Sequence, residues 1–390
     1  MNSLLLKNVL HKGQKTNILI EGRRFSRIGV PALTEAGKVV DCDGLAIIPA
    51  FYNTHNHAPM IPMRGLGEDR PLQTWLQDYI WPYEAKMTPG DVREGSEKAV
   101  REMISGGTVF FSDMYFEIEE TIDVVARSGM RAAIGITFLD GHDKCQQIEK
   151  LDFLHNWQDP TGGRISLTLD PHAIYTAGPE IYRKVHELSA ETGLMVHTHL
   201  AETVKEVEDC VKLHGTTPVR YLDSLGVLDS RVVAAHCVHV DKEEWDILAE
   251  RGVTVAHCPC SNMKLGSGRF PYELAIASGA RITLATDGPS SNNNLDMREE
   301  MKFAALLAKV AGDPTLLPAE EIFRWATVNG AEAFGIDAGV IEEGKLADAV
   351  LLDTKEERLQ PCYNLVSNWV YSADSGCVAA TLCDGEIISA

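Results

Sequence analysis

The sequence predicts an α/β fold, a (β/α)8 TIM barrel with a small β-sandwich domain built from both chain ends. Three observations lead to this prediction: eight short β-rich runs, helix-like stretches between them, and further strand-like segments before and after. The 390 residues suit one large domain with a smaller one. We expect residues 51–344 to form the barrel, and 1–50 together with 345–390 to form the β domain.

Eight short runs rich in β-branched, aromatic and aliphatic residues are the expected barrel strands. In order they are AFYNTHNH, TVFFSDMY, AAIGITFLD, RISLTLDPHA, MVHTHLAE, RVVAAHCVH, VTVAHCP and RITLATDG. Helix-like stretches separate them, among them PGDVREGSEKAVREMISGG, the segment 146–157, GPEIYRKVHELSAETG, KEEWDILAERG and PYELAIASGA. Several of these close with glycine, a common helix stop. Eight alternations of strand and helix are typical of a TIM barrel.

The two ends of the chain carry shorter strand signals. TNILIEG and KVVDCDG lie near the N-terminus, and LADAVLLD, NLVSNWVYS, CVAATLCDG and EIISA follow a helical region at 318–335. Each end is too small to fold alone. We therefore expect the two ends to pair into one β domain beside the barrel.

Composition and charge exclude several classes of partner. The formal net charge of −20 disfavours binding to nucleic acid or to an anionic membrane surface. No apolar run approaches the roughly 20 residues that span a bilayer, and the start, MNSLLLKNVLHKG, does not resemble a signal peptide. Nine cysteines without a repeated spacing argue against a disulfide framework. We expect a cytoplasmic protein with a small-molecule partner.

Polar residues end several predicted strands, where the catalytic groups of a TIM barrel collect. His55 and His57 end the first strand and project to the same side, because side chains on a strand alternate. His199 ends the fifth strand, His236 the sixth and Asp287 the eighth. Neutral imidazoles with a carboxylate suit zinc, and three or four such ligands make a catalytic site. A lone strand-end histidine is more often structural, but this ordered set indicates a metal.

Eight segments spread over nearly the whole chain carry a family resemblance: PAFYNTHNH, RPLQTWLQDYIWPYEAK, SGGTVFFSDMYF, DPHAIYT, HTHLAET, AAHCVH, AHCPCSNMKLGSG and ATDGPSSNNNLDM. They resemble the amidohydrolase superfamily, and within it the methylthioadenosine/S-adenosylhomocysteine deaminases and their chlorohydrolase relatives. The resemblance implies that His55, His57, His199 and Asp287 bind one divalent metal ion per subunit, expected to be Zn2+. The fourth predicted strand lacks the lysine that binuclear members use, which favours a single ion.

The same resemblance implies hydrolytic deamination of adenosine-type nucleosides, in which metal-bound hydroxide attacks C6 of the purine and releases ammonia and an inosine-type product. Zinc lowers the pKa of a bound water to about 7. Asp287 would take the proton of that water, Glu202 would protonate the ring nitrogen, and His236 would orient the hydroxide. From the residues alone Glu202 could equally begin the next helix, because acidic residues favour a first turn.

Four residues are expected to bind the substrate. By resemblance, Glu84 contacts the ribose hydroxyls and His172 helps to hold the sugar, while Trp75 and Trp81 wall the pocket. Glu84 could instead be a solvated helix charge, and the tryptophans could be plain core. The segment LDGHDKCQQIEK offers Lys144 and no arginine for an amino-acid carboxylate. This favours 5′-methylthioadenosine or adenosine over S-adenosylhomocysteine.

Two other functions remain compatible with the sequence. The same metal chemistry could act on another heterocycle, a guanine-like base or an s-triazine, as an aminohydrolase or chlorohydrolase. The chain could also be a non-catalytic scaffold of the same fold. We expect a homo-oligomer, because association is common among relatives. Three histidines and two cysteines are expected to be packing, loop or supporting residues: His197, His239, His257, Cys258 and Cys260.

Overall fold

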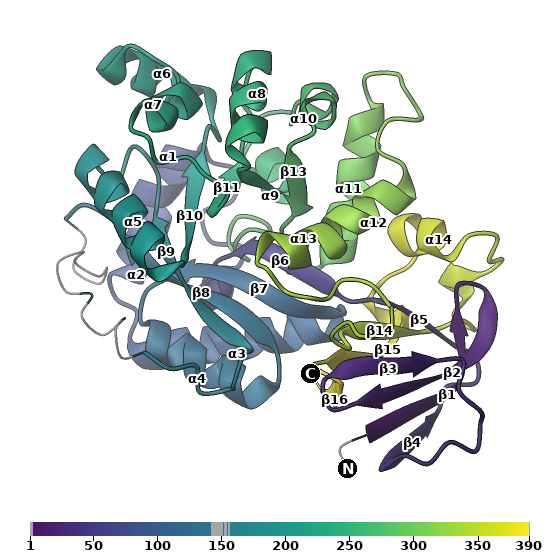
Figure 1. The fold of residues 1–390 in the computed structure, drawn as a ribbon. Coiled ribbons are helices and arrows are strands. Elements are labelled where there is room, and N and C mark those ends of the chain that lie inside the picture. Colours follow the sequence, from purple (N-terminus) through teal and green to yellow (C-terminus); the bar gives the residue numbers. More distant parts are fainter. Residues whose placement is uncertain (1–2, 142–150, 152–153, 155–156, 390) are drawn as a thin grey trace.

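The computed structural model describes residues 3–141, 151, 154 and 157–389, and two eight-stranded sheets form its framework (Figure 1). One sheet has the order β13-β12-β11-β10-β9-β8-β7-β6, and its strand pairs are parallel. The other has the order β16-β15-β14-β5-β1-β2-β3, with β4 beside β1. The barrel and the separate β domain predicted from the sequence are both confirmed.

The barrel strands follow one another around the barrel in chain order. They are β6 (Phe51–Asn56), β7 (Thr108–Tyr115), β8 (Arg131–Phe138), β9 (Ile165–Pro171), β10 (Met195–Leu200), β11 (Val232–His236), β12 (Thr254–His257) and β13 (Arg281–Leu284). At the seam between β13 and β6, Thr54 Oγ1 donates to the Leu284 carbonyl over 3.2 Å. The Asp287 N–H donates to the His55 carbonyl over 3.1 Å, just beyond the strand ends. The last strand thus meets the first beside the predicted ligands.

Helices surround the barrel, as the alternating pattern predicts. They are α3 (Pro89–Ser105), α4 (Ile118–Ser128), α5 (Pro179–Thr192), α6 (Val204–His214), α7 (Pro218–Ser224), α8 (Lys242–Arg251), α9 (Pro259–Lys264), α10 (Tyr272–Ser278), α11 (Met297–Lys309), α12 (Ala319–Ala326) and α13 (Val328–Ala333). Gly193 and Gly252 end α5 and α8 with φ of 75° and 72°, a left-handed conformation that glycine adopts without strain. The helix expected at 146–157 lies almost wholly outside the described residues.

The connection after β6 is a long segment that covers one side of the barrel mouth. It holds η1 (Ala58–Met63), α1 (Leu72–Trp75), the π-helical turn η2 (Leu76–Ile80) and α2 (Trp81–Glu84). Its apolar residues form a cluster with Tyr115 and Phe116 at the end of β7. Single π-turns are frequent at functional sites, and this one precedes the predicted substrate residue Glu84.

The β domain joins the two ends of the chain into one continuous mixed sheet. Its strands are β1 (Ser3–His11), β2 (Gln14–Glu21), β3 (Arg24–Ile28), β4 (Lys38–Asp41), β5 (Leu45–Pro49), β14 (Ala349–Asp353), β15 (Val378–Cys383) and β16 (Glu386–Ile388). β5 pairs antiparallel with β14 and so connects the two ends. Along β14, Ala349 and Leu351 pack into the core of the β domain, whereas Val350 and Leu352 pack against the barrel. The predicted residue boundaries between the domains stay a prediction.

One predicted strand is wrong. NLVSNWVYS forms the helix α14 (Leu365–Tyr371) rather than a strand. The side chain of Asn364 caps its first turn by accepting from the Ser367 N–H over 2.8 Å. Trp369 is buried and stacks on Phe51 of β6. The helix thus packs the Trp369 ring against the barrel.

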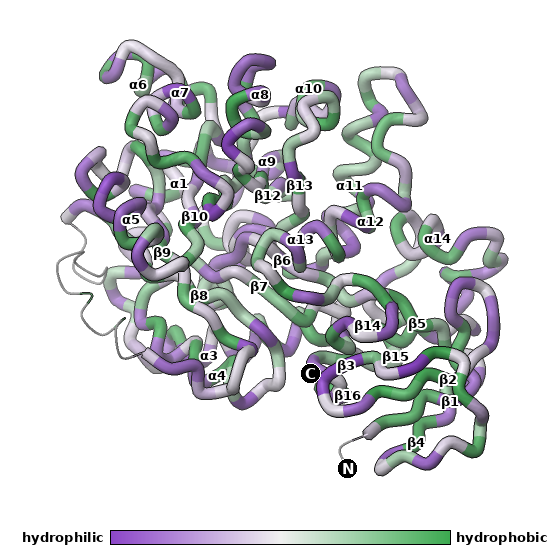
Figure 2. The backbone as a smooth tube through the Cα atoms, in the orientation of Figure 1, coloured by the Kyte–Doolittle hydropathy of each residue, from purple (hydrophilic) through white to green (hydrophobic). Residues whose placement is uncertain are grey.

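Figure 2 shows hydrophobic residues concentrated along the strands of both sheets, while hydrophilic residues alternate with them on the outer helices. This pattern is typical of helices with one face on a core and the other in solvent. Within the described part of the chain, no helix is long and apolar enough to cross a membrane.

Candidate metal centre and active site

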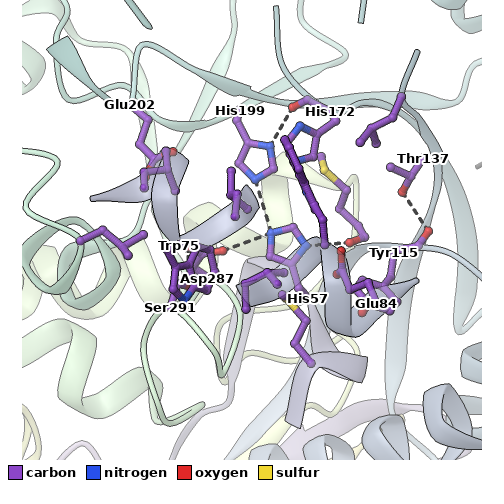
Figure 3. Close-up of a pocket in the computed structure, with 18 of the residues that line it drawn as sticks. His57, Trp75, Glu84, Tyr115, Thr137, His172, His199, Glu202, Asp287 and Ser291 are labelled. Carbon is purple, nitrogen blue, oxygen red and sulfur yellow. Dashed lines mark hydrogen bonds and ion pairs between the residues drawn. The ribbon is translucent and has the colours of Figure 1, made fainter. Parts of the chain in front are cut away.

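Four side chains converge at the C-terminal end of the barrel. Asp287 Oδ1 lies 3.2 Å from Nε2 of His55 and 3.2 Å from Nε2 of His57. His199 Nε2 lies 3.3 Å from His57 Nε2. The four candidate ligand atoms all lie within 4.8 Å of one another, and Figure 3 shows His57, His199 and Asp287 facing one another. The structure therefore brings together the four residues predicted as metal ligands.

The hydrogen bonds of the three histidines leave Nε2 of each ring facing the centre of the cluster. The Nδ1 atoms contact His197 Nε2 at 2.9 Å from His55, the Met114 carbonyl at 2.7 Å from His57, and the His172 carbonyl at 2.7 Å from His199. A carbonyl only accepts, so Nδ1 of His57 and of His199 carries the proton and Nε2 is free to bind a metal. The buried Nε2 of His55 faces the Asp287 carboxylate, 3.2 Å from Oδ1.

The electrostatics of the cluster fit a bound cation. Burial lowers the pKa of His55 to about 4, which keeps that imidazole neutral, as a metal ligand must be. For His57 the effect of burial is outweighed by the Asp287 carboxylate, and its pKa is raised to about 9. A proton on His57 balances the negative charge of the Asp287 carboxylate. A divalent cation bound between the same atoms would bring more positive charge to that carboxylate than this proton does.

The short helix α9 and the segment after β13 hold Asp287 and His236 in place. Ser261 of α9 and Ser291 donate to Asp287 Oδ2 over 2.6 and 2.7 Å, so Oδ1 remains turned to the histidines. Asn262 of α9 bonds Nδ1 of His236 over 2.9 Å through its side-chain oxygen. None of these three polar residues was predicted from the sequence. Serine and asparagine are common in loops, and only their place directly after strand ends hinted at a role.

The backbone is left-handed at three of these strand ends. Ala201, His236 and Asp287 have φ of 49°, 72° and 60°. Residues other than glycine adopt such angles rarely and at a cost, and strained residues of this kind cluster at active sites. Both His236 and Asp287 line the pocket.

Glu202 is buried at the mouth of the barrel, with 4% of its surface exposed. It precedes Thr203, the N-cap of α6, so it is not an exposed residue of the first helical turn. Ser267 donates to Glu202 Oε1 over 3.1 Å, and Oε2 lies 4.0 Å from Nε2 of His236. Burial raises the pKa of the Glu202 carboxyl above its ordinary value, which favours the protonated form that a general acid needs.

A pocket opens above the histidine cluster. All four predicted substrate residues line it: Trp75, Trp81, Glu84 and His172. Glu84 is only 8% exposed, so it is not a solvated helix charge. In Figure 3, Glu202 lies on one side of the metal cluster, and Glu84 with Tyr115 lies on the other. Tyr115 lies beside Glu84 and was not predicted from the sequence. Burial and the Glu84 carboxylate raise the pKa of the Tyr115 hydroxyl.

The walls of the pocket are mainly apolar and aromatic. None of the described residues that line it is a lysine or an arginine. Lys144, considered as a partner for a substrate carboxylate, lies outside the described residues. The described walls therefore suit a neutral ligand with an aromatic ring.

The remaining histidines and cysteines have other partners. His257 Nε2 contacts the Tyr272 hydroxyl at 2.8 Å, and His239 Nε2 contacts the Ser267 carbonyl at 2.6 Å. The Cys258 sulfur lies close to the ring nitrogens of His55 and His236. Burial raises the pKa of Cys258, and also that of Cys260, so both stay neutral thiols.

The match to known families covers both parts of the fold. The model of the amidohydrolase family matches residues 46–388. The chain belongs to the amidohydrolase family. A 5-methylthioadenosine/S-adenosylhomocysteine deaminase 1 of Archaeoglobus fulgidus is 44% identical over 387 residues, 95% of this chain and 89% of that protein. A 5′-deoxyadenosine deaminase of Methanothermobacter thermautotrophicus is 42% identical over 381 residues, 96% of this chain and 89% of that protein.

Solved structures extend this match to three dimensions. The crystal structure of an adenosine deaminase from Xanthomonas campestris with bound zinc has a TM-score of 0.92 and 32% identity, covering 99% of this chain and 92% of that one. This amidohydrolase has three imidazoles and a carboxylate at the mouth of its barrel. This donor set suits a divalent metal ion.

Proposed function

We propose that this amidohydrolase is a metal-dependent deaminase that hydrolyses the C6 amino group of adenosine-type nucleosides and releases ammonia and an inosine-type product. The observation that carries the proposal is the placement of a buried acid, Glu202, and of His236 beside the ligand cluster, with Glu84 across the pocket. The activities named for the relatives from Archaeoglobus and Methanothermobacter support the same substrate class.

The residues of the cluster divide the proton transfers between them. His55, His57, His199 and Asp287 would hold a divalent ion, and this ion would act as the Lewis acid that makes a water nucleophilic near neutral pH. Asp287, with Oδ2 held by two serine hydroxyls, accepts a proton from the attacking water and passes it to the leaving amine. Nδ1 of His236 donates to Asn262, which leaves Nε2 to accept a hydrogen bond from that water and orient it.

Glu202 completes the reaction at the ring. Attack at C6 places electron density on the adjacent ring nitrogen, which must gain a proton as the tetrahedral adduct forms. The raised pKa of Glu202 keeps a proton available in a buried site. The proposed role is donation of this proton to the ring nitrogen.

Substrate recognition is assigned to the opposite wall. Glu84 offers two acceptor oxygens to the vicinal hydroxyls of a ribose, and Trp75, Trp81 and His172 enclose the nucleoside. Because the described walls carry no lysine or arginine, we assign neutral 5′ substituents, as in 5′-methylthioadenosine and adenosine, ahead of S-adenosylhomocysteine.

Three finer assignments belong to the proposal. The metal is zinc, because three imidazoles and one carboxylate are a zinc-type set and the Xanthomonas relative is described with bound zinc. The enzyme works in the cytoplasm, where the eight described cysteines, all free, stay reduced. It associates as a homo-oligomer, as is common in the family.

The test is ammonia release by zinc-supplemented protein from adenosine, 2′-deoxyadenosine, 5′-methylthioadenosine, S-adenosylhomocysteine, guanine and an amino-triazine. Glu84→Ala should raise KM for the ribonucleosides about 10- to 100-fold, the effect of losing hydrogen bonds to a charged group. The penalty should shrink for 2′-deoxyadenosine, which lacks one of the two hydroxyls. Glu97→Ala, on the exposed face of α3, is the control.

Turnover of guanine or the triazine alone would contradict the nucleoside assignment and favour the other heterocycles. A protein that holds no stoichiometric metal after supplementation, and that turns over nothing, would favour the non-catalytic scaffold.

A further inference from the structure

The turn that carries Glu202 has an unusual backbone. β10 ends at Leu200, and Ala201 follows with a φ of 49°, in the left-handed region. Alanine adopts this region at a cost, so neighbouring interactions must hold it there. Both Ala201 and Glu202 are buried, and their N–H groups need partners inside the protein.

Those partners are the two oxygens of one carboxylate. The Ala201 N–H donates to Glu206 Oε1 over 2.8 Å, and the Glu202 N–H donates to Glu206 Oε2 over 2.8 Å. Glu206 is 3% exposed and lies in the first turn of α6. Two successive N–H groups around a left-handed residue form a nest, a recurrent binding site for anions. Here the anion belongs to the chain itself.

Comparison with α8 shows that this is more than a helix cap. In α8, Glu244 reaches back three residues and accepts from the N–H of the N-cap, Asp241, over 3.0 Å, as a capping box requires. Glu206 occupies the same position in α6, and its N–H also donates to the N-cap hydroxyl, Thr203 Oγ1, over 3.1 Å. Its side chain, however, passes the N-cap and reaches the two residues before it.

We propose that Glu206 is a positioning residue for catalysis: its carboxylate fixes the Ala201–Glu202 turn and so directs the Glu202 carboxyl toward the reacting ring. The inference rests on the proposed function, in which Glu202 donates a proton. The Glu202 side chain has one hydrogen bond of its own, from Ser267, within the described part of the chain. Its direction therefore depends on the peptide groups that Glu206 holds.

The chemistry of the carboxylate predicts what substitution would do. An amide at position 206 offers one acceptor oxygen, and its NH2 group would face the second backbone N–H. One N–H would then lose its partner, and the left-handed turn would relax. A displacement of about 1 Å at a catalytic group can cost about 100-fold in rate. The hydrogen bonds of Glu206 in this turn run to Ala201, Glu202 and Thr203 and not to a metal ligand, so the metal ligands would keep their places.

A double-mutant cycle in the full-length, zinc-supplemented enzyme tests the proposal. Glu206→Gln should lower kcat for adenosine about 10- to 100-fold, with KM changed less than about threefold. When Glu202 is already replaced by Gln, Glu206→Gln should change the residual kcat by less than about threefold, because the group that it positions is gone. An undiminished loss in the Glu202→Gln background would overturn the inference.

Controls separate this result from general damage and from failure of the proposed function. Glu244→Gln removes the matched carboxylate from α8 and should leave kcat unchanged; an equal loss there would also overturn the inference. If Glu206→Gln does not fold, Glu206→Asp, which keeps the charge but is too short to reach both N–H groups, enters the same cycle. If Glu202→Gln alone keeps full kcat, the proposed acid role falls. If Glu202→Gln is slow but the two losses multiply, only the positioning role falls.

Discussion

The two ends of the barrel differ in how they hold buried charged side chains. At the end that meets the β domain these side chains form ion pairs with one another, and at the other end they line a pocket. At the first end, Arg131 begins β8 and contacts Asp348 at 2.9 Å, and it also pairs with Asp384. Tyr52 donates to the same Asp348 over 2.7 Å. At the mouth, the Asp287 carboxylate is shared by two imidazoles: its Oδ1 lies 3.2 Å from Nε2 of His55 and 3.2 Å from Nε2 of His57.

The backbone does not distinguish the two ends. Ala201, His236 and Asp287 have left-handed φ angles at the mouth, and Asp384 has a φ of 58° at the opposite end. The contrast lies in the polar groups: paired polar groups stabilise a fold, whereas polar atoms left facing a cavity are maintained where function needs them. Changes at the mouth should therefore cost activity, and changes at the opposite end should cost stability.

The largest effect is expected at the ligand cluster. Asp287→Asn should lower kcat/KM at least about a thousandfold and remove most of the bound metal, because an amide is a poor ligand and cannot take a proton from water. The free energy of unfolding of the metal-free protein should change by only about 1 kcal/mol. The amide oxygen can still accept from Ser261 and Ser291, and its NH2 group can donate to the free nitrogens of His55 or His57.

Ammonia release, metal content by mass spectrometry and urea unfolding of the metal-free protein measure the three parts of this prediction. A large loss of stability together with the loss of activity would contradict the comparison, since it would make Asp287 a structural residue as well.

The opposite result is expected at the end that meets the β domain. Arg131→Met leaves Asp348, which is fully buried, without its cation and should destabilise the protein by about 3 to 5 kcal/mol. Arg23 pairs with Asp384 at 2.6 Å, but its side chain is 43% exposed. Arg23→Met should therefore cost less than about 1 kcal/mol. Urea unfolding measures both, and kcat/KM per folded molecule should stay unchanged. Equal costs for the two arginines would contradict the argument from burial.

An intermediate effect is expected from the histidine behind the cluster. His197 Nε2 contacts Nδ1 of His55 at 2.9 Å, and Ser112 Oγ lies 3.2 Å from its other nitrogen. For His55 to bind metal through Nε2, its Nδ1–H must donate to His197. His197→Leu should therefore weaken metal affinity about 10- to 100-fold, the usual cost of losing a partner of a metal-binding histidine.

Competition with a chelator measures that affinity independently of turnover. His257→Leu is the matched control, because His257 is equally buried at the end of β12 and contacts Tyr272 instead of a ligand. A similar loss of affinity in both variants would show that the effect comes from disturbed packing.

The sequence predicted the barrel and the four clustered residues because both depend on local order. Strand runs separated by helices identify the fold, and a residue that ends a parallel strand lies at the mouth whatever the details of packing. His55, His57, His199 and Asp287 could thus be grouped before any distance was known. Their roles rest on the family resemblance and stay a prediction.

Residues whose role depends on tertiary contacts could not be predicted. Ser261, Asn262 and Ser291 have ordinary polar side chains, and only the packing of α9 and of the segment after β13 brings them to Asp287 and His236. Glu206 has the sequence signature of a helix cap, and the bonds that set it apart run to residues before the cap. The segment of α14 has a strand-like composition, which led to the wrong prediction of a strand. Its helical structure is stabilised by the Asn364 cap and by the packing of Trp369 against Phe51 of the barrel.

The smallest effect is expected from Glu300 of α11, a buried carboxyl at the mouth. It accepts from the Cys260 N–H over 3.0 Å and from the Asn292 side chain over 2.6 Å, and so ties the loops after β12 and β13 together. Burial raises the pKa of Glu300 to about 8, whereas an unfolded glutamate titrates near 4.3, roughly the model-peptide value. Between these pH values the folded protein holds a proton that the unfolded chain has lost.

The stabilising effect of this carboxyl is therefore complete below the unfolded pKa and is lost as the pH rises toward 8. Glu300→Gln cannot titrate, so the wild type should lose about 1 kcal/mol relative to this variant between about pH 6.5 and about pH 7.5. Urea unfolding of both metal-free proteins at the two pH values measures the difference. Parallel curves would mean that Glu300 is charged in the folded protein. The mouth would then hold a buried carboxylate stabilised by two N–H donors alone, and the contrast with the paired charges at the other end would be sharper than proposed.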